Sequence, residues 1–164
     1  IAEYLEIFKR IKEINSKIEF SSDFIIGYPG EESKDFEDTL KLIKKVNFIN
    51  SYSFVFSPRP GTVAENLKLI NKEESQKRLQ IVQNQLFKNQ LTMNQSLENK
   101  TLEILVENLT KDKTQAFGRT EYMTSVLFNG KKEDIGKIVP VKIIGSNRST
   151  LFGEIVNNSN QKVA

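Results

Sequence analysis

The chain contains two similar segments, Phe24-Ile-Ile-Gly-Tyr-Pro-Gly-Glu31 and Tyr52-Ser-Phe-Val-Phe-Ser-Pro-Arg-Pro-Gly-Thr62. In each, an apolar run stops abruptly at a turn of glycine and proline, which is typical of a buried parallel strand that ends in a ligand-facing loop. A single helical pattern around Phe36 lies between them. The two segments therefore predict consecutive βα units of an α/β enzyme, with strands near residues 18–26 and 49–56.

The apolar period changes near Lys100. Before it, we expect an amphipathic helix over residues 1–15 and a long polar helix that begins at Asn71, where Glu74 completes a capping signal. After it, apolar and polar residues alternate, as in strands. Five short strands in so short a stretch indicate a small closed or nearly closed β-barrel of the OB type. They are expected near residues 102–107, 115–120, 125–128, 138–144 and 151–156.

The composition narrows the possible chemistry. The 164 residues carry a net charge of +3 and include no cysteine and no histidine. The chain therefore offers no thiolate or imidazole ligand for zinc, haem or an iron–sulfur cluster, and no Ser-His-Asp or Cys-His nucleophile. The small positive net charge neither excludes nucleic-acid binding nor predicts it.

The N-terminus resembles neither a signal peptide nor a membrane anchor. Charged residues interrupt its apolar positions, and no apolar run in the chain approaches the length that spans a membrane, so a cytoplasmic protein is expected. The first residue is not Met and already lies inside a helical pattern with no cap before it. This start indicates a chain cut from something longer.

The loop at residues 27–31 has two interpretations. Gly27 and Gly30 would let the backbone approach a ligand, and the amides ahead of the next helix favour a carboxylate or a phosphate. At the carboxyl end of a parallel strand, such a loop faces the usual ligand site. The alternative is a tight βα turn that binds nothing.

The loop at residues 57–62 is stiffened because Pro58 and Pro60 bracket Arg59. A guanidinium on a stiff loop suits recognition of phosphate or carboxylate, and the alternative is a rigid connector with Arg59 in a surface ion pair. Just before this loop, the alternating aromatic residues Tyr52, Phe54 and Phe56 are expected to be core.

The predicted barrel carries several cations and one aromatic residue that suit RNA. OB-like barrels bind nucleic acid through phosphate contacts and base stacking. Acidic residues at 103, 107 and 154 offset part of this positive charge, so charge alone does not decide whether the barrel binds RNA. The residues concerned are Arg119, Tyr122, Lys137, Lys142 and Arg148.

Several short motifs, spaced along the chain from residue 22 to residue 156, together resemble the motifs of a known family. The strongest are Ser22-Asp-Phe-Ile-Ile-Gly-Tyr-Pro-Gly-Glu31 and Phe56-Ser-Pro-Arg-Pro-Gly-Thr62, followed by Gly118-Arg-Thr120, Ile135-Gly-Lys137 and Leu151-Phe-Gly-Glu-Ile-Val156. In this order they resemble the radical-SAM tRNA methylthiotransferases. The nearest branch makes 2-methylthio-N6-isopentenyladenosine next to the anticodon of tRNA.

The resemblance implies a fold of α/β plus all-β class in four parts. Residues 1–70 would be the last βα units of the radical-SAM partial TIM-like barrel, and residues 71–94 a helical connector. Residues 95–157 would be a TRAM domain, an OB-like five-stranded β-barrel that holds tRNA, and residues 158–164 a tail.

The resemblance also implies site residues. Those bordering the cofactor S-adenosylmethionine would be Gly27, Gly30, Glu31 and Ser57. Those facing the substrate would be Arg59, Thr62 and Arg119. The charge and aromatic pattern of the barrel adds Tyr122 and Lys137 as candidate tRNA-binding residues. Related branches modify threonylcarbamoyladenosine in tRNA or an aspartate of a ribosomal protein, but the Ser-Pro-Arg-Pro-Gly-Thr and Gly-Arg-Thr elements favour tRNA.

The chain departs from the family in two respects. The family's CxxxCxxC motif and its N-terminal cysteine-bearing domain are missing, so this chain cannot ligate the family's 4Fe–4S clusters and is expected to be inactive alone. It would be a C-terminal portion that comes from a split gene, from a truncated gene or from trimming of a longer chain. Its partners would be tRNA and, in the case of a split gene, a separate cysteine-bearing polypeptide. In addition, Tyr122-Met-Thr-Ser125 replaces an Asn-Asn-Arg-like run of many relatives, which removes a cation from the RNA face. A rival hypothesis is a stand-alone RNA-binding module with a degenerate barrel remnant.

Overall fold

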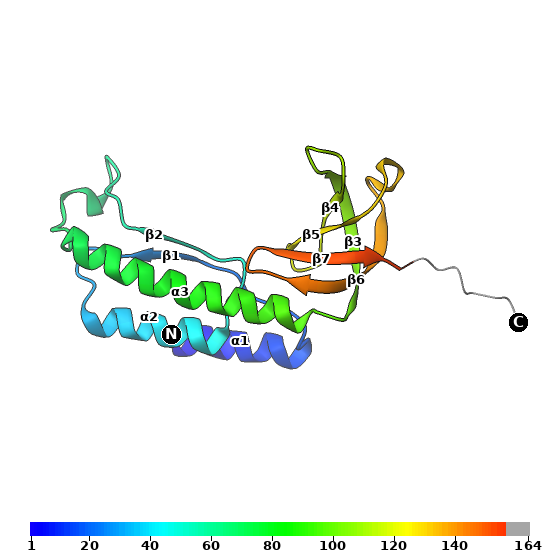
Figure 1. Cartoon of the computed structure of the whole chain (residues 1–164). Helices are drawn as coiled ribbons and strands as arrows, with labels where there is room; N and C mark the ends of the chain where they lie inside the picture. Colours follow the sequence, from blue (N-terminus) through cyan, green and yellow to red (C-terminus); the bar gives the residue numbers. More distant parts are fainter. Residues whose placement is uncertain (157–164) are drawn as a thin grey trace, which may run out of the picture. The chain divides into compact units, whose positions relative to one another are not determined.

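The computed structural model describes residues 1–156, and the predicted tail at residues 158–164 lies outside them. The chain divides into two compact units, Ile1–Asn89 and a second that begins at Gln90 (Figure 1). The long helix α3 (Lys72–Ser96) contributes residues to both units.

The first unit is built on a β-α-β arrangement. Strands β1 (Asp23–Ile26) and β2 (Tyr52–Val55) pair in parallel, and helix α2 (Ser33–Val46) connects them. Helix α1 (Ala2–Ile14) precedes this arrangement, and a 3-10 turn, η1 (Val63–Asn66), follows it. The expected helices and the parallel strand pair are confirmed.

Both strands are shorter than the sequence predicts. Asn50 has φ +46°, a left-handed conformation that breaks the extended run between residues 49 and 52. The ladder of β2 therefore begins at Tyr52, and β1 pairs with it only from Asp23 onward. The predicted extensions to residues 18 and 49 are wrong for this reason.

One face of the β1–β2 pair is buried. Phe24 and Ile26 point to this face and pack against helices α2 and α3, where Ile43 and Val82 are fully buried. Glu32 is the N-cap of helix α2, and its backbone N–H donates to Asp35 in a capping box. This packing removes the apolar face of the amphipathic helix from water, which is the main force that holds the unit together.

The opposite face of the same pair is open. Ile25, Tyr52 and Phe54 are 59, 67 and 55% exposed, so the expectation that the aromatic alternation is core is wrong for Tyr52 and Phe54. The physical reason is that alternate residues of a strand point to opposite faces. Within residues 1–156, helices cover only the face of Phe24 and Ile26.

The second unit is a closed five-stranded barrel, which confirms the β-barrel prediction. Its strand order is β3-β4-β5-β7-β6, in which β5 and β7 are parallel and every other pair is antiparallel. The strands are β3 (Thr101–Leu109), β4 (Ala116–Arg119), β5 (Ser125–Asn129), β6 (Ile138–Ser146) and β7 (Thr150–Ile155).

The barrel interior is filled by side chains from all five strands, together with Leu97 just after α3. Gly118 allows β3 and β4 to approach, because a Cβ there would lie 2.5 Å from the Leu105 carbonyl oxygen. On α3, the fully buried Asn94 donates to the backbone oxygens of Asn147 and Arg148 at 2.8 and 3.1 Å. These bonds hold the β6–β7 loop onto the helix.

Candidate functional site

The loop at residues 27–31 follows β1 and is fixed from the inside. Gly27 is buried with φ +75°, and a Cβ at this position would lie 2.5 Å from Ser75 Oγ of α3. Its N–H donates to Glu31 Oε2 at 2.9 Å. Gly27 and the Glu31 carboxylate therefore face the protein and set the shape of the loop.

Arg78 of α3 completes this arrangement. The side chain is 8% exposed, and its Nη1 donates to Glu31 Oε1 at 2.8 Å and to the Glu31 carbonyl oxygen at 3.2 Å. Its Nε donates to Glu74 at 2.8 Å, and the guanidinium lies 5.4 Å from the centre of the Phe36 ring. The hydrogen bond to Glu31 is the main cause of a raised Arg78 pKa, so the guanidinium stays charged.

Sequence reasoning missed Arg78. The spacing of four residues between Glu74 and Arg78 favours an ion pair on a helix and is the one local signal that could have pointed to Arg78, but Glu31 lies 47 residues away in the chain. No local sequence pattern links Arg78 to Glu31.

The remainder of the loop faces outward. A Cβ at Gly30 would meet no atom within 4 Å, and Tyr28 is 48% exposed. The Tyr28 ring meets Phe56 edge-on with 4.9 Å between centroids, which brings the loops after β1 and β2 together. Ser57, directly after Phe56, is exposed at the same carboxyl end of the strand pair.

The loop at residues 57–62 is held by its own hydrogen bonds. Thr62 Oγ1 donates to the Arg59 carbonyl oxygen at 2.8 Å, and the Gly61 N–H donates to Glu65 at 2.8 Å. Both Arg59 and Thr62 are exposed. No carboxylate among residues 1–156 pairs with the Arg59 guanidinium, so the ion pair considered as the alternative is not seen in this part of the chain.

The predicted RNA-binding residues occupy different surroundings on the barrel. Arg119 pairs with Glu107 at 3.2 Å, donates to the Met123 carbonyl oxygen at 3.0 Å and lies 5.5 Å from the Phe117 ring centre. Tyr122 is half-buried against the barrel core, and Lys137 is exposed before β6. The charge of Arg119 is therefore balanced by the carboxylate of Glu107.

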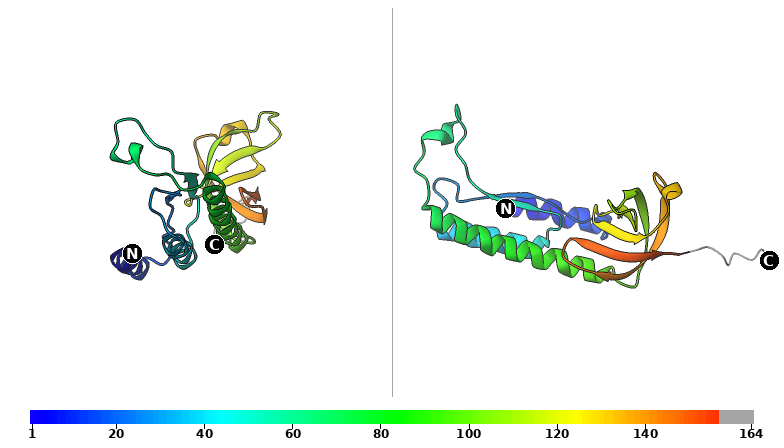
Figure 2. Two further views of the ribbon diagram at one scale, coloured as in Figure 1. Left: turned by 90° about the vertical axis from the view of Figure 1, so that its left-hand side faces the viewer. Right: turned by 45° about the horizontal axis from the view of Figure 1, so that its top comes forward.

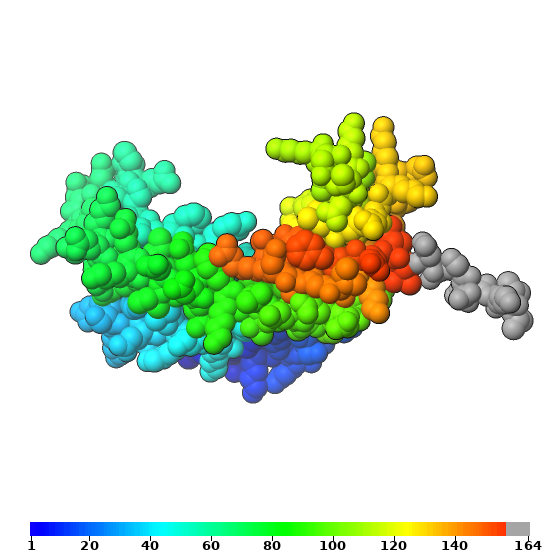
Figure 3. Space-filling model, viewed as in Figure 1, coloured from blue at the N-terminus to red at the C-terminus, as the bar shows by residue number. Residues whose placement is uncertain are grey.

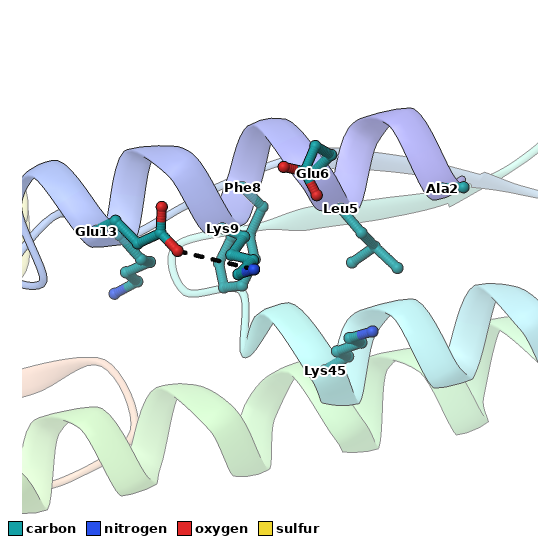
Figure 4. Close-up of a pocket in the computed structure, with 8 residues that line it drawn as sticks. Ala2, Leu5, Glu6, Phe8, Lys9, Glu13 and Lys45 are labelled. Carbon is teal, nitrogen blue, oxygen red and sulfur yellow. Dashed lines mark ion pairs between the residues drawn. The ribbon is translucent and has the colours of Figure 1, made fainter.

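A hollow on the first unit is lined by α1 and Lys45 of α2 (Figure 4). Its apolar wall is Leu5 and Phe8, and its ion pair, Lys9–Glu13, is 3.8 Å long and largely exposed. None of the predicted site residues lines it, and we assign it no function.

Metal ligands are scarce in this chain. The sequence has no cysteine or histidine, and residues 1–156 contain no group of three or more His, Cys, Asp or Glu side chains that could hold a metal ion. In the same part of the chain, no helix combines the length and apolar character needed to cross a membrane.

Comparison with known proteins gives two kinds of similarity. Residues 95–156 match the TRAM domain. The whole chain is 59% identical to the tRNA-2-methylthio-N(6)-dimethylallyladenosine synthase of Pelagibacter ubique (strain HTCC1062), of which it covers 37%. Over 95% and 97% of the chain, it is 44% identical to the enzyme of the same name from Orientia tsutsugamushi (strain Boryong) and 39% identical to that of Yersinia enterocolitica, covering 35% and 34% of them.

The chain therefore spans little more than a third of the length of these curated relatives. The similarity extends through both units and includes the β-α-β loops as well as the barrel. These findings confirm the resemblance drawn from the sequence: the chain matches a portion of the tRNA-2-methylthio-N(6)-dimethylallyladenosine synthases that includes their TRAM domain.

Proposed function

We propose that the chain is the C-terminal portion of a tRNA methylthiotransferase that adds a 2-methylthio group to N6-dimethylallyladenosine. The observation that carries this proposal is the 59% identity that extends over all 164 residues, through both units. The predicted cytoplasmic location follows from a tRNA substrate.

The first unit would be the end of a radical-SAM partial barrel. Parallel sheets are normally covered on both faces. Here helices cover one face of β1 and β2, whereas Ile25 and Phe54, which are register partners, expose an apolar second face. This pattern is what the inner face of an incomplete barrel would show, and it supports the proposal that the first unit is part of such a barrel.

The loops after β1 and β2 fit a wall of an S-adenosylmethionine pocket. Gly30 and Ser57 would contact the cofactor because they are exposed at the carboxyl ends of the strands. Gly27 and Glu31, which face inward, would act by shaping the loop, and Arg59 and Thr62 would face the substrate. S-adenosylmethionine supplies radical chemistry when it is cleaved at a reduced cluster.

The residues of this chain do not fit the cluster itself. Thiolates hold 4Fe–4S clusters, and this sequence contains none. The cluster would be held by a part of the protein outside this sequence or by a separate polypeptide, and the chain alone would be inactive.

The test is a chimera. In the Pelagibacter ubique relative, the segment that matches this chain is replaced by this chain, and the chimera is produced in bacteria that lack their own methylthiotransferase. Mass spectrometry of tRNA nucleosides should then detect 2-methylthio-N6-dimethylallyladenosine. If only the unmethylthiolated nucleoside accumulates, while the parental relative is active in the same cells, the proposal is wrong.

The second unit would hold tRNA, with Arg119, Tyr122 and Lys137 in contact with it. Arg119→Ala should weaken tRNA binding and flatten its salt dependence, because each phosphate contact releases counterions. An unchanged salt slope in a filter-binding titration contradicts this role for Arg119.

The stand-alone RNA-binding module remains a second candidate because the barrel is closed and has its own core. Tight binding of tRNA by residues 95–157 alone, together with an inactive chimera, would favour it. Co-purification of the chain with a cysteine-bearing polypeptide would favour the methylthiotransferase.

A further inference from the structure

We propose that two loops at one end of the barrel, residues 110–115 and 130–137, form the main phosphate-binding surface for tRNA. We call them the lysine loops. This inference rests on the proposed tRNA binding and assigns it to residues that the motif resemblance mostly does not name.

The two loops project from the same end of the barrel. The first connects β3 to β4, and the second connects β5 to β6. Ala116, at the start of β4, pairs with both Leu109 at the end of β3 and Phe128 near the end of β5, so both loops leave the sheet at one level. All views show them side by side (Figures 1 and 2), and they stand out from the surface in Figure 3.

The loops concentrate unpaired positive charge. They contain five lysines and three acidic residues, and all five lysines are exposed. Within residues 1–156, none of these lysines forms an ion pair with a carboxylate. The lysines are Lys111, Lys113, Lys131, Lys132 and Lys137.

Two of the three acidic side chains bond to the loops themselves. Asp112 accepts hydrogen bonds from Thr110 Oγ1 at 2.6 Å and the Thr114 N–H at 3.2 Å. Asp134 accepts the Lys131 N–H at 2.8 Å. These bonds shape the tips of the loops, so the lysine side chains on them are left to point toward solvent.

The backbone of the second loop is also tied to the barrel. The Gly136 N–H donates to the Val106 carbonyl oxygen at 2.8 Å, and the Val106 N–H donates to the Lys137 carbonyl oxygen at 2.9 Å. A loop ordered before binding loses little further backbone entropy when it meets its ligand. A fixed, positively charged surface suits the phosphate backbone of a folded RNA.

Arg119 provides a contrast. Its guanidinium is paired with Glu107 and bonded to the Met123 carbonyl oxygen. Because contact with a phosphate would compete with these partners, Arg119 should contribute less to the salt dependence than the free lysines do.

The experiment measures binding of fluorescently labelled tRNA carrying N6-dimethylallyladenosine by the full chain over a series of salt concentrations. The test variant is K111Q/K113Q/K131Q/K132Q. The matched control is K34Q/K44Q/K88Q/K100Q, which removes four exposed lysines elsewhere. The test variant should bind more weakly, with a log–log salt slope shallower by about three, since each of the four lost phosphate contacts contributes about 0.7 to 0.9.

The control variant should keep the wild-type slope, and K111R/K113R/K131R/K132R should restore it. If the test variant has the slope and affinity of the wild type, the lysine loops are not the phosphate-binding surface, and the proposed function is unaffected. If the test variant and the control lose affinity equally, the proposed role of the lysine loops is also wrong, because binding would then depend on net charge alone. Absence of salt-dependent binding by the wild-type chain overturns the proposed tRNA binding itself.

Discussion

Replacement of Arg78 by methionine should release the loop at residues 27–31. Arg78 is buried, and its guanidinium satisfies Glu31 and Glu74, each at 2.8 Å. Methionine keeps apolar packing against Phe36 but leaves the Glu31 carboxylate buried without its cation. Removal of one partner of a buried pair costs about 3 to 5 kcal/mol, and we expect the lower figure because water can reach the edge of the loop.

The most direct measurement is hydrogen exchange of the Gly27 amide, because this N–H is bonded to Glu31. A loss of about 3 kcal/mol corresponds to exchange that is roughly 100-fold faster, since about 1.4 kcal/mol is a factor of ten. Glu31→Gln alone should have a smaller effect because Glu74 still balances Arg78. The double variant should be more stable than the sum of the single effects predicts, by about 1 to 3 kcal/mol.

The control is Lys41→Met, which breaks the exposed Lys41–Asp38 pair of the same unit and should leave Gly27 exchange unchanged. If R78M exchanges at the wild-type rate, Arg78 does not hold the loop. Zero coupling between the variants at 31 and 78 would show that the two charges act independently, which also contradicts the reasoning.

Three further predictions concern the same molecule. Asn94→Leu should destabilise the barrel unit by about 1 to 3 kcal/mol, because it leaves the carbonyl oxygens of Asn147 and Arg148 without their donor; amide exchange in β6 and β7 measures this, and unchanged exchange contradicts it. Gly118→Val should disrupt the β3–β4 pairing, whereas Gly145→Ala, where a Cβ meets nothing within 4 Å, should be tolerated; circular dichroism on heating compares the two, and equal melting temperatures would refute the close approach. Hydrogen bonds from Thr110 and Thr114 lower the Asp112 pKa below 3.8. The stability that this carboxylate contributes is therefore present above that value and is lost as the pH falls through the lowered pKa. Carbon NMR titration of Asp112 should find a midpoint below 3.8, and Thr110→Val should raise this midpoint.

Local patterns were sufficient to predict most of the elements. Asn71 accepts the N–H groups of Glu73 and Glu74, as the capping signal at the start of α3 predicted. The change of period at Lys100 predicted five strands, and all five are present. These features depend on residues within a few positions of one another, which is why a single sequence is enough to predict them.

What depends on distant residues could be decided only by the tertiary structure. Alternation along a strand places Phe54 and Ser53 on opposite faces of β2, but it does not determine which face packs against helices. In this structure the aromatic face is the open one. The parallel pairing of β5 with β7 likewise depends on how the barrel closes. The motif marked Glu31 as a site residue, but only the fold shows that its carboxylate turns inward to Arg78, because that contact joins parts of the chain with no local signal between them.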